Sequence, residues 1–335
     1  MFNIANLPDK DRAALFHNTA IKCGMKDAIV EKDFWVCWAM NYLFQHSPWR
    51  DHFAFKGGTS LSKGYGLIER FSEDIDLILD WRLLNYSKDQ PWQARSKTQQ
   101  DKFNKEIDDK CAEFLRDIFE PQLEKDFGRM LDRAFSLHIF DEDPQTVTFA
   151  YPQLFEDNSI LKVIRLEIGA LAAWTPTQNI TVIPYAAEHY PHIFKVSGTN
   201  VLTVAPERTF WEKITILHRE AFRTNGNFPD RYSRHYYDLF CMNSTHVKMK
   251  AFNNLELLDR VATFKSRFYP TNAARYDLAK PGTIQLIPPD ECVSKLESDY
   301  ILMQNMIYGK KPDFNDLMSC MHRSENEINQ LKTPA

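Results

Sequence analysis

Residues 55–79 read FKGGTSLSKGYGLIERFSEDIDLIL, and they place two aspartates inside an otherwise apolar run. Successive residues of a strand point to opposite faces, so Asp74 and Asp76 would share one face, about 6 to 7 Å apart along the strand. Two ionised carboxylates this close repel each other and lose hydration in an apolar strand, unless a cation neutralises them. The pair therefore predicts a site for a hard divalent cation, Mg²⁺ or Mn²⁺, with oxygen ligands.

The paired glycines before this strand predict a phosphate site. Gly57 and Gly58 allow the backbone to come close to a ligand. The N–H groups of Thr59 and Ser60 would lie at the start of a helix, where they can bind the oxygens of a triphosphate. A phosphate-binding turn beside a metal-binding strand would make one site.

A D-x-D pair alone also has a purely structural interpretation. Asp74 and Asp76 would then lie at an exposed strand end, where they cap a helix or pair with Arg70. Two other ligand motifs do not fit. Lys63 is followed by glycine and lacks the Walker A spacing, and the residues after Asp76 are apolar where a calcium loop needs oxygen ligands and a glycine.

Composition sets broad limits. The chain has 335 residues, of which 44% are hydrophobic and 26% charged, which is enough for a substantial core and for two domains. A net charge of -4 excludes a generally basic nucleic-acid-binding protein, so any RNA contact needs a local patch. Six cysteines without a C-x-x-C pair argue against a zinc ribbon. We expect reduced thiols, a cytoplasmic location, no signal peptide and no membrane helix.

The order of the predicted elements indicates an α/β (α+β) protein, with a mixed sheet flanked by helices and a helical C-terminal domain. Helices are predicted within 10–46, and a charged, exposed helical insertion near 87–127. Strands are predicted around KGG, at EDIDLILDW, and in four segments between residues 134 and 185. The expected domains are 1–190, containing the sheet, and 191–335, mainly helical and completing the active site.

The stretch resembles the nucleotidyltransferase superfamily with the DNA polymerase beta fold, whose signature is G-[GS], a spacer and D-h-[DE]-h. It is more closely similar to the AbiEii-type nucleotidyltransferase toxins of type IV abortive-infection toxin–antitoxin pairs, which share GGT-x-L, a basic residue and R-F-S-x-D-h-D-L. The similarity runs from EKDFWV at 31–36 to about residue 240. It implies a nucleotide-binding role for the matching positions, which are Gly57, Gly58, Thr59, Ser60, Lys63, Arg70 and Ser72.

The resemblance also implies three further catalytic residues. The superfamily's third carboxylate would be Glu167 in KVIRLEIG, although a salt bridge to Arg165 is an equal alternative. The family's lysine and aspartate motifs match WEKITILHRE and RYSRHYYDLF, and imply Lys213 and Asp238. The structural alternatives are a solvated Lys213 and an ion pair between Asp238 and Arg234.

The function that the resemblance implies is Mg²⁺-dependent transfer of NMP from an NTP to an acceptor hydroxyl at the 3′ end of tRNA, by a toxin that an antitoxin restrains. Residues 260–280 interleave basic and aromatic side chains, as an RNA contact would, although an amphipathic helix with a solvated basic face is as good an interpretation. Two alternatives stay open: a nucleotide- or partner-binding module without catalysis, and a phosphotransferase that modifies a protein or small molecule.

Overall fold

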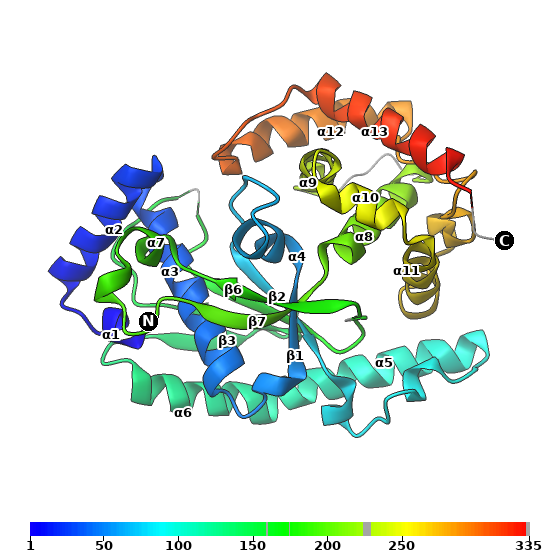
Figure 1. Ribbon diagram of the computed structural model, residues 1–335. Helices are drawn as coiled ribbons and strands as arrows, with labels where there is room; N and C mark the ends of the chain where they lie inside the picture. The colour runs from blue at the N-terminus through cyan, green and yellow to red at the C-terminus, as the bar shows by residue number, and fades with distance from the viewer. Residues whose placement is uncertain (159, 174, 224–228, 333–335) are drawn as a thin grey trace. The chain divides into compact units, whose positions relative to one another are not determined.

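The computed structural model describes residues 1–158, 160–173, 175–223 and 229–332 (Figure 1). It divides into two compact units. The first comprises Met1–Gly64 and Ser72–Thr203, and the second comprises Tyr65–Phe71 and Val204–Ala335. The predicted domain boundary after residue 190 stays a prediction, and residues 333–335 of the predicted second domain lie outside the described part.

In the described part of the chain, seven strands form one mixed sheet, as predicted. The strands are β1 (Phe53–Lys56), β2 (Asp74–Leu79), β3 (Ser136–Ile139), β4 (Thr146–Ala150), β5 (Ile164–Gly169), β6 (Thr177–Val182) and β7 (Thr199–Val204). Their spatial order is β3-β4-β5-β2-β1-β7-β6. β2 is central, antiparallel to β1 and parallel to β5, so the strand with the two aspartates has a neighbour on each side.

The two faces of the sheet differ in character. Ile75, Leu166 and Val147 form one row across β2, β5 and β4, and all three are buried. Helix α3 (Asp27–Asn41) and helix α6 (Glu120–Met130) cover this apolar face, where Trp38 and Phe127 both contact the ring of Phe149 on β4. Because strand residues alternate, Asp74 and Asp76 are left on the other face.

The helical insertion exists and its charged side is exposed, but it also has a buried side that was not predicted. It consists of α5 (Lys97–Phe114), a π-helical turn (Leu115–Phe119) and α6, which follow one another along the sheet in Figure 1. Ile107 and Leu123 are fully buried, and the Cys111 thiol donates to the carbonyl of Ile168 at 3.7 Å. The charged composition of this segment conceals an apolar stripe at helical spacing, which packs against the sheet.

Strand β7 was not predicted, because the helical half of the chain was expected to begin near residue 190. Thr199, Val201 and Thr203 are buried, whereas Asn200 and Leu202 between them are exposed. This alternation and the β-branched residues are the local signals of a strand. Six residues are too few to outweigh the helical pattern that follows, so the pairing with β1 becomes evident only in the sheet.

Helix α8 (Pro206–Ala221) opens the helical part of the second unit. Proline stands at its first position, where its missing N–H costs no hydrogen bond, and Phe210, Ile214 and Leu217 form a fully buried stripe. The other helices of this unit are α9 (Ser233–Asn243), α10 (His246–Phe252), α11 (Leu255–Phe268), α12 (Asp290–Met303) and α13 (Phe314–Gln330). Those of the first unit are α1 (Phe2–Ala5), α2 (Asp9–Cys23), α3, α4 (Gly57–Thr59), α5, α6 and α7 (Tyr185–His189).

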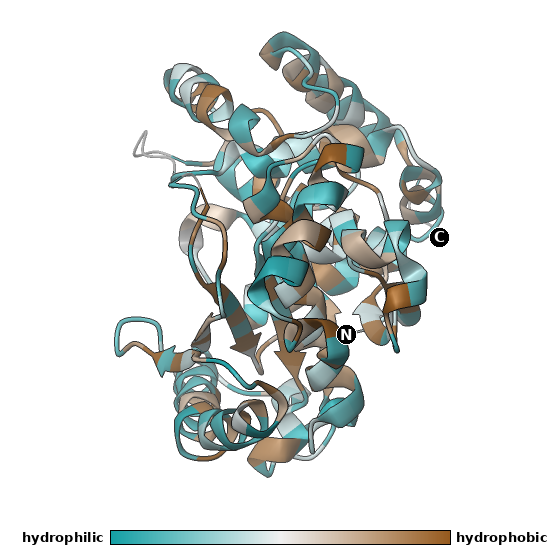
Figure 2. Ribbon diagram, turned by 90° about the vertical axis from the view of Figure 1, so that its left-hand side faces the viewer, coloured by the Kyte–Doolittle hydropathy of each residue, from teal (hydrophilic) through white to brown (hydrophobic). Residues whose placement is uncertain are grey.

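Hydropathy differs between the strands and the helices. In Figure 2 the strands are largely hydrophobic, whereas most helices carry both hydrophobic and hydrophilic turns. Such helices have one side to bury and one to expose. Among the residues that the structure describes, no helix is both long and apolar enough to cross a membrane.

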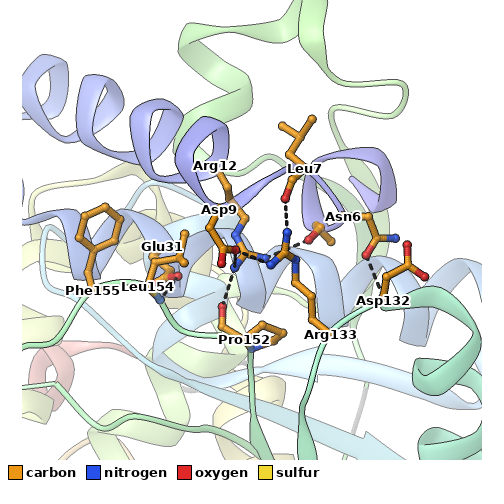
Figure 3. Close-up of polar contacts among 11 residues, drawn as sticks. Asn6, Leu7, Asp9, Arg12, Glu31, Asp132, Arg133, Pro152, Leu154 and Phe155 are labelled. Atoms are coloured by element: carbon orange, nitrogen blue, oxygen red, sulfur yellow. Dashed lines mark hydrogen bonds and ion pairs between the residues drawn. The ribbon is translucent and has the colours of Figure 1, made fainter.

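A buried polar network anchors the N-terminal helices to the segment after β4 (Figure 3). Glu31 on α3 is fully buried and accepts the N–H groups of Leu154 at 2.8 Å and Phe155 at 2.9 Å. Arg12 on α2 donates to the carbonyl of Pro152 at 3.1 Å. Burial raises the pKa of Glu31 to about 7, although the two backbone N–H groups and Arg12 act in the opposite direction.

The buried carboxyl predicts a pH-dependent stability. Between about pH 4.5 and 7, the native state holds a proton on Glu31 that the unfolded chain releases, so the free energy of unfolding falls as pH rises. Relative to Glu31→Gln, the wild type should lose about 3 kcal/mol across this window, as urea unfolding at several pH values would measure. If the difference in free energy of unfolding between the wild type and Glu31→Gln did not change with pH, the raised pKa of Glu31 would be contradicted.

Candidate active site

The two aspartates of β2 share one face, as the sequence predicts. Asp74 and Asp76 are half-buried, and the intervening Ile75 is fully buried. In the parallel register with β5, Asp74 pairs with Arg165 and Asp76 pairs with Glu167. Paired residues point to the same face, so three carboxylates and one guanidinium are gathered there.

Glu167 lies where either interpretation of its sequence would place it, and its catalytic role stays a prediction. It is the cross-strand neighbour of Asp76, and its carboxylate also lies 3.3 Å from the guanidinium of Arg165. The same guanidinium donates to Asp143 at 2.7 Å. Asp143 has no motif in the sequence, and only the return of the chain to β5 brings it here.

The face carries an excess of negative charge. Burial, then Asp76 and Asp74, raise the pKa of Glu167 to about 7, although Arg165 and Lys56 lower it. The pKa of Asp74 is raised by burial and then by the neighbouring carboxylates. Lys56 on β1 is the other cross-strand neighbour of Asp76, and its position directly before the glycine pair is the sequence signal by which it could have been found.

The donor set suits a hard cation. Within the described ranges, no group of three or more His, Cys, Asp or Glu side chains forms a complete metal centre. Mg²⁺ typically takes one or two protein carboxylates and completes its shell with water and substrate phosphates. Asp74 and Asp76 fit that requirement, because they supply only oxygen and repel each other when no cation is present.

The glycine turn packs directly against this pair. Gly57 has a φ of +79°, and a Cβ at this position would lie 1.8 Å from Oδ2 of Asp76. The Thr59 hydroxyl donates to the carbonyl of Asp74 at 2.5 Å, and the Ser60 hydroxyl donates to the carbonyl of Gly57 at 2.8 Å. The turn is therefore fastened to the strand that it faces, with the Asp76 carboxylate against the bare Cα of Gly57.

Replacement of Gly57 by alanine should displace the Asp76 carboxylate. The added methyl group cannot fit at 1.8 Å, and the left-handed backbone adds strain for any L side chain. We expect nucleotidyl transfer to fall about 100-fold, measured as initial rate with labelled NTP. Gly24→Ala is the control, because Gly24 has a similar φ of +63° and no atom within 4 Å of its Cβ position. If Gly57→Ala and Gly24→Ala lowered the transfer rate equally, the close approach of Asp76 to Gly57 would not explain the loss.

The other predicted nucleotide-binding residues lie in different surroundings. Gly58 and Ser72 are half-buried. Gly58 lies within the glycine turn, and Ser72 lies two residues before β2. The Lys63 ammonium is buried, 2.9 Å from Asp33 and 3.7 Å from Glu188. The nucleotide-binding roles of these residues stay predictions.

A second charged cluster lies within the second unit. Arg70 makes a bidentate pair with the fully buried Asp238, at 2.7 and 2.8 Å. Lys213 is also buried, with its ammonium 2.6 Å from Asp238 and 3.5 Å from Nδ1 of His235. Lys213 is therefore not a solvated helix residue, and the partners of Asp238 are Arg70 and Lys213 rather than Arg234.

The charges of this cluster are strongly coupled. Burial alone would raise the pKa of Asp238, but Arg70 and Lys213 together hold it well below its usual range. Burial lowers the pKa of Lys213, and Asp238 offsets part of that effect. Burial and the neighbouring Lys213 also hold the pKa of His235 well below its usual value, so this ring is neutral near pH 7.

Comparison with known families decides the classification. The profile described as nucleotidyl transferase AbiEii toxin, type IV toxin–antitoxin system, matches residues 38–320, which is well over half of the chain. The chain belongs to the AbiEii family. It is thus a nucleotidyltransferase of the toxin type, and the predicted resemblance is confirmed. The match extends well beyond residue 240, so the prediction that the similarity fades there was wrong.

The chain is also similar, at low identity, to two solved structures. MenT4, a nucleotidyltransferase toxin from Mycobacterium tuberculosis, is 15% identical with a TM-score of 0.42, over 96% of this chain and 99% of its own. A candidate nucleotidyltransferase from H. pylori is 15% identical with a TM-score of 0.41, over 90% of this chain and 97% of its own. No curated protein matches the chain significantly.

The basic and aromatic segment of this AbiEii protein does not present its phenylalanines for base stacking. Phe264 and Phe268 are buried on α11. Lys265 donates to the carbonyl of Glu212 at 2.8 Å, and burial lowers its pKa to about 7. Tyr269, by contrast, is 53% exposed. The helical spacing of these aromatic residues serves the core, which corrects the RNA-contact interpretation for both phenylalanines.

The structure thus groups the predicted residues of this AbiEii protein in two sets. Asp74, Asp76 and Glu167 come together in the first unit, with Gly57 against Asp76. Arg70, Lys213 and Asp238 come together in the second.

Proposed function

We propose that this AbiEii protein transfers NMP from an NTP to a hydroxyl at the 3′ end of tRNA, with Mg²⁺ bound at Asp74 and Asp76 and with release of pyrophosphate. Family membership establishes the nucleotidyltransferase and toxin class. The observation that supports the metal-dependent chemistry is the row of Asp74, Asp76 and Glu167 on one face of the sheet, with Gly57 directly against Asp76.

Each residue of the first unit has a distinct role in this proposal. A bound Mg²⁺ supplies polarisation of the α-phosphate and neutralises the charge that develops on it. Glu167, the cross-strand neighbour of Asp76, accepts the proton of the attacking hydroxyl. Arg165 orients that carboxylate, and Gly57 lets the Asp76 carboxylate lie directly against the backbone of the turn.

Lys213 and Asp238 are the proposed catalytic residues of the second unit. The family's lysine and aspartate motifs imply the two roles. Their 2.6 Å contact supports these roles, because Asp238 holds the ammonium in one position and favours its charged form. In this proposal Lys213 contacts a triphosphate oxygen, and Asp238 orients the lysine.

The biological setting follows from the family. A type IV toxin has an antitoxin partner and, as a nucleotidyltransferase, an NTP substrate. We propose that the protein acts in the cytoplasm, where tRNA and NTPs are both present. The described cysteines are all free thiols, which is compatible with that compartment.

The decisive experiment offers each α-³²P-labelled NTP to the purified protein with Mg²⁺ and total RNA, followed by a denaturing gel. We expect a labelled band of tRNA size that disappears with EDTA. It should also disappear when the RNA is first oxidised with periodate, which destroys its 3′ terminal diol. Release of pyrophosphate distinguishes this reaction from a phosphotransferase, which would release a nucleoside diphosphate. Label on a protein or small molecule alone would overturn the tRNA acceptor.

A further inference from the structure

Three consecutive charged residues on α3 are buried. Glu31 and Lys32 have no exposed surface, and Asp33 is 5% exposed. Burial of a charge is costly unless the group is paired and hydrogen-bonded. Three in succession around a helix must also point in different directions, since each residue advances the helix by about 100°. Their partners therefore lie on separate segments.

Lys32 joins the beginning of β2 to the approach to β5. Its ammonium lies 2.6 Å from Oε2 of Glu73 and donates to the carbonyl of Leu161 at 2.7 Å. The N–H of Leu161 donates back to the same Glu73 oxygen at 3.3 Å. Glu73 directly precedes Asp74, and Leu161 lies just before the start of β5, the strand that carries Glu167.

Asp33 supports the end of the glycine turn. Its carboxylate lies 2.9 Å from the ammonium of Lys63 and accepts the N–H of Tyr185 at 2.7 Å. The Lys63 ammonium also lies 3.3 Å from the ring centre of Tyr185. Lys63 belongs to the π-helical turn Ser60–Gly64, which continues directly from Gly57–Thr59.

Glu31 holds the segment that leads from β4 towards Leu161. It accepts the N–H groups of Leu154 and Phe155, as Figure 3 shows. One helix thus binds, through three adjacent side chains, the residue directly before β2, the chain that leads to β5 and the end of the glycine turn.

We propose that Glu31, Lys32 and Asp33 are the positioning residues of the transfer site, with Lys32 and Glu73 setting the metal-binding carboxylates and Asp33 setting the phosphate turn through Lys63. This inference rests on the proposed function. An apolar pair could fill the place of Lys32 and Glu73 with no desolvation cost. The ion pair instead supplies orientation. It holds the backbone of Leu161 through both its N–H and its C=O, and it fixes the start of β2.

The test separates the two halves of the proposal. The double variant Lys32→Met/Glu73→Gln removes both charges together, so neither is left buried and unpaired. The matched control makes the same two substitutions, Lys110→Met and Glu106→Gln, in the exposed pair on α5 whose atoms lie 3.0 Å apart. Mn²⁺ binding to the metal-free protein is measured by the EPR signal of the free ion, and transfer kinetics are measured with labelled NTP.

For the double variant we expect Mn²⁺ binding about 10-fold weaker and a kcat about 10-fold to 100-fold lower, with the control unchanged. Asp33→Asn keeps an acceptor for the Tyr185 N–H but loses the charge that holds Lys63. It should raise the KM for NTP about 10-fold and leave Mn²⁺ binding within about twofold of wild type. A general loss of packing would not weaken Mn²⁺ binding in one variant and raise only the KM for NTP in the other.

The proposal is overturned if the folded double variant binds Mn²⁺ and turns over like wild type, or if Asp33→Asn changes neither KM nor kcat. If the double variant does not fold, Asp33→Asn decides. Mn²⁺ binding needs no RNA, so a wild type that binds Mn²⁺ but labels no RNA would refute the proposed acceptor and leave the Mn²⁺-binding test of Lys32 and Glu73 intact.

Discussion

Asp76→Asn should abolish nucleotidyl transfer while the protein stays folded. Loss of one of the two proposed metal-binding carboxylates removes several kcal/mol of charge stabilisation, which corresponds to about a 10³-fold lower rate. The substitution preserves shape and still leaves the amide against Gly57. It also removes one charge from a row in which Asp76 raises the pKa values of both Asp74 and Glu167. The thermal midpoint should therefore stay the same or rise.

Initial rates with labelled NTP and a thermal melt of the same preparation measure both effects. Asp109→Asn, on an exposed position of α5, is the control for the chemical change itself. Lower activity together with a markedly lower melting temperature would indicate that Asp76 is structural. Transfer at the wild-type rate would remove the pair from the active site altogether.

Asp238→Asn should destabilise the protein strongly. The carboxylate is fully buried between Arg70 and Lys213, and its removal leaves two buried cations with a neutral amide. Breaking a buried pair by removing one partner costs about 3 to 5 kcal/mol of the free energy of unfolding. Lys213→Met should cost less, because the bidentate contact between Arg70 and Asp238 remains.

Urea unfolding of the three proteins gives these values directly, provided that the slopes of the transitions agree. Asp277→Asn is the matched control, because it removes the partner of Arg275 on the surface, and it should leave the urea midpoint unchanged. If Asp238→Asn unfolds at the wild-type midpoint, the cluster does not stabilise the native state. If Lys213→Met keeps full transfer activity, its proposed role with the triphosphate is wrong.

Elements with a strong local period were predictable. The alternation around Asp74 and Asp76 appears in the structure as a half-buried pair flanking a buried isoleucine, and the stripe at Phe210, Ile214 and Leu217 is the buried side of α8. Both depend on geometry repeated within a few residues. Such geometry is set by the backbone and does not depend on the rest of the chain.

The glycine pair was predictable only in part. The sequence indicates that the backbone at Gly57 must approach something closely, but it does not say what. The structure names the Asp76 carboxylate, 19 positions later, because the antiparallel pairing of β1 and β2 folds one onto the other. The same pairing places Lys56 across from Asp76.

What the sequence determined by itself was therefore the chemistry available: two carboxylates on one face, a glycine turn, and a family signature. Tertiary structure alone decided the partners of the charged groups. Asp238 could have paired with Arg234, four residues away, but it pairs with Arg70 at a separation of 168 residues. Lys32 finds Glu73 and Leu161 only once β2 and β5 are adjacent. A buried charge requires a partner, and which partner it meets depends on packing between distant segments, which no local period encodes.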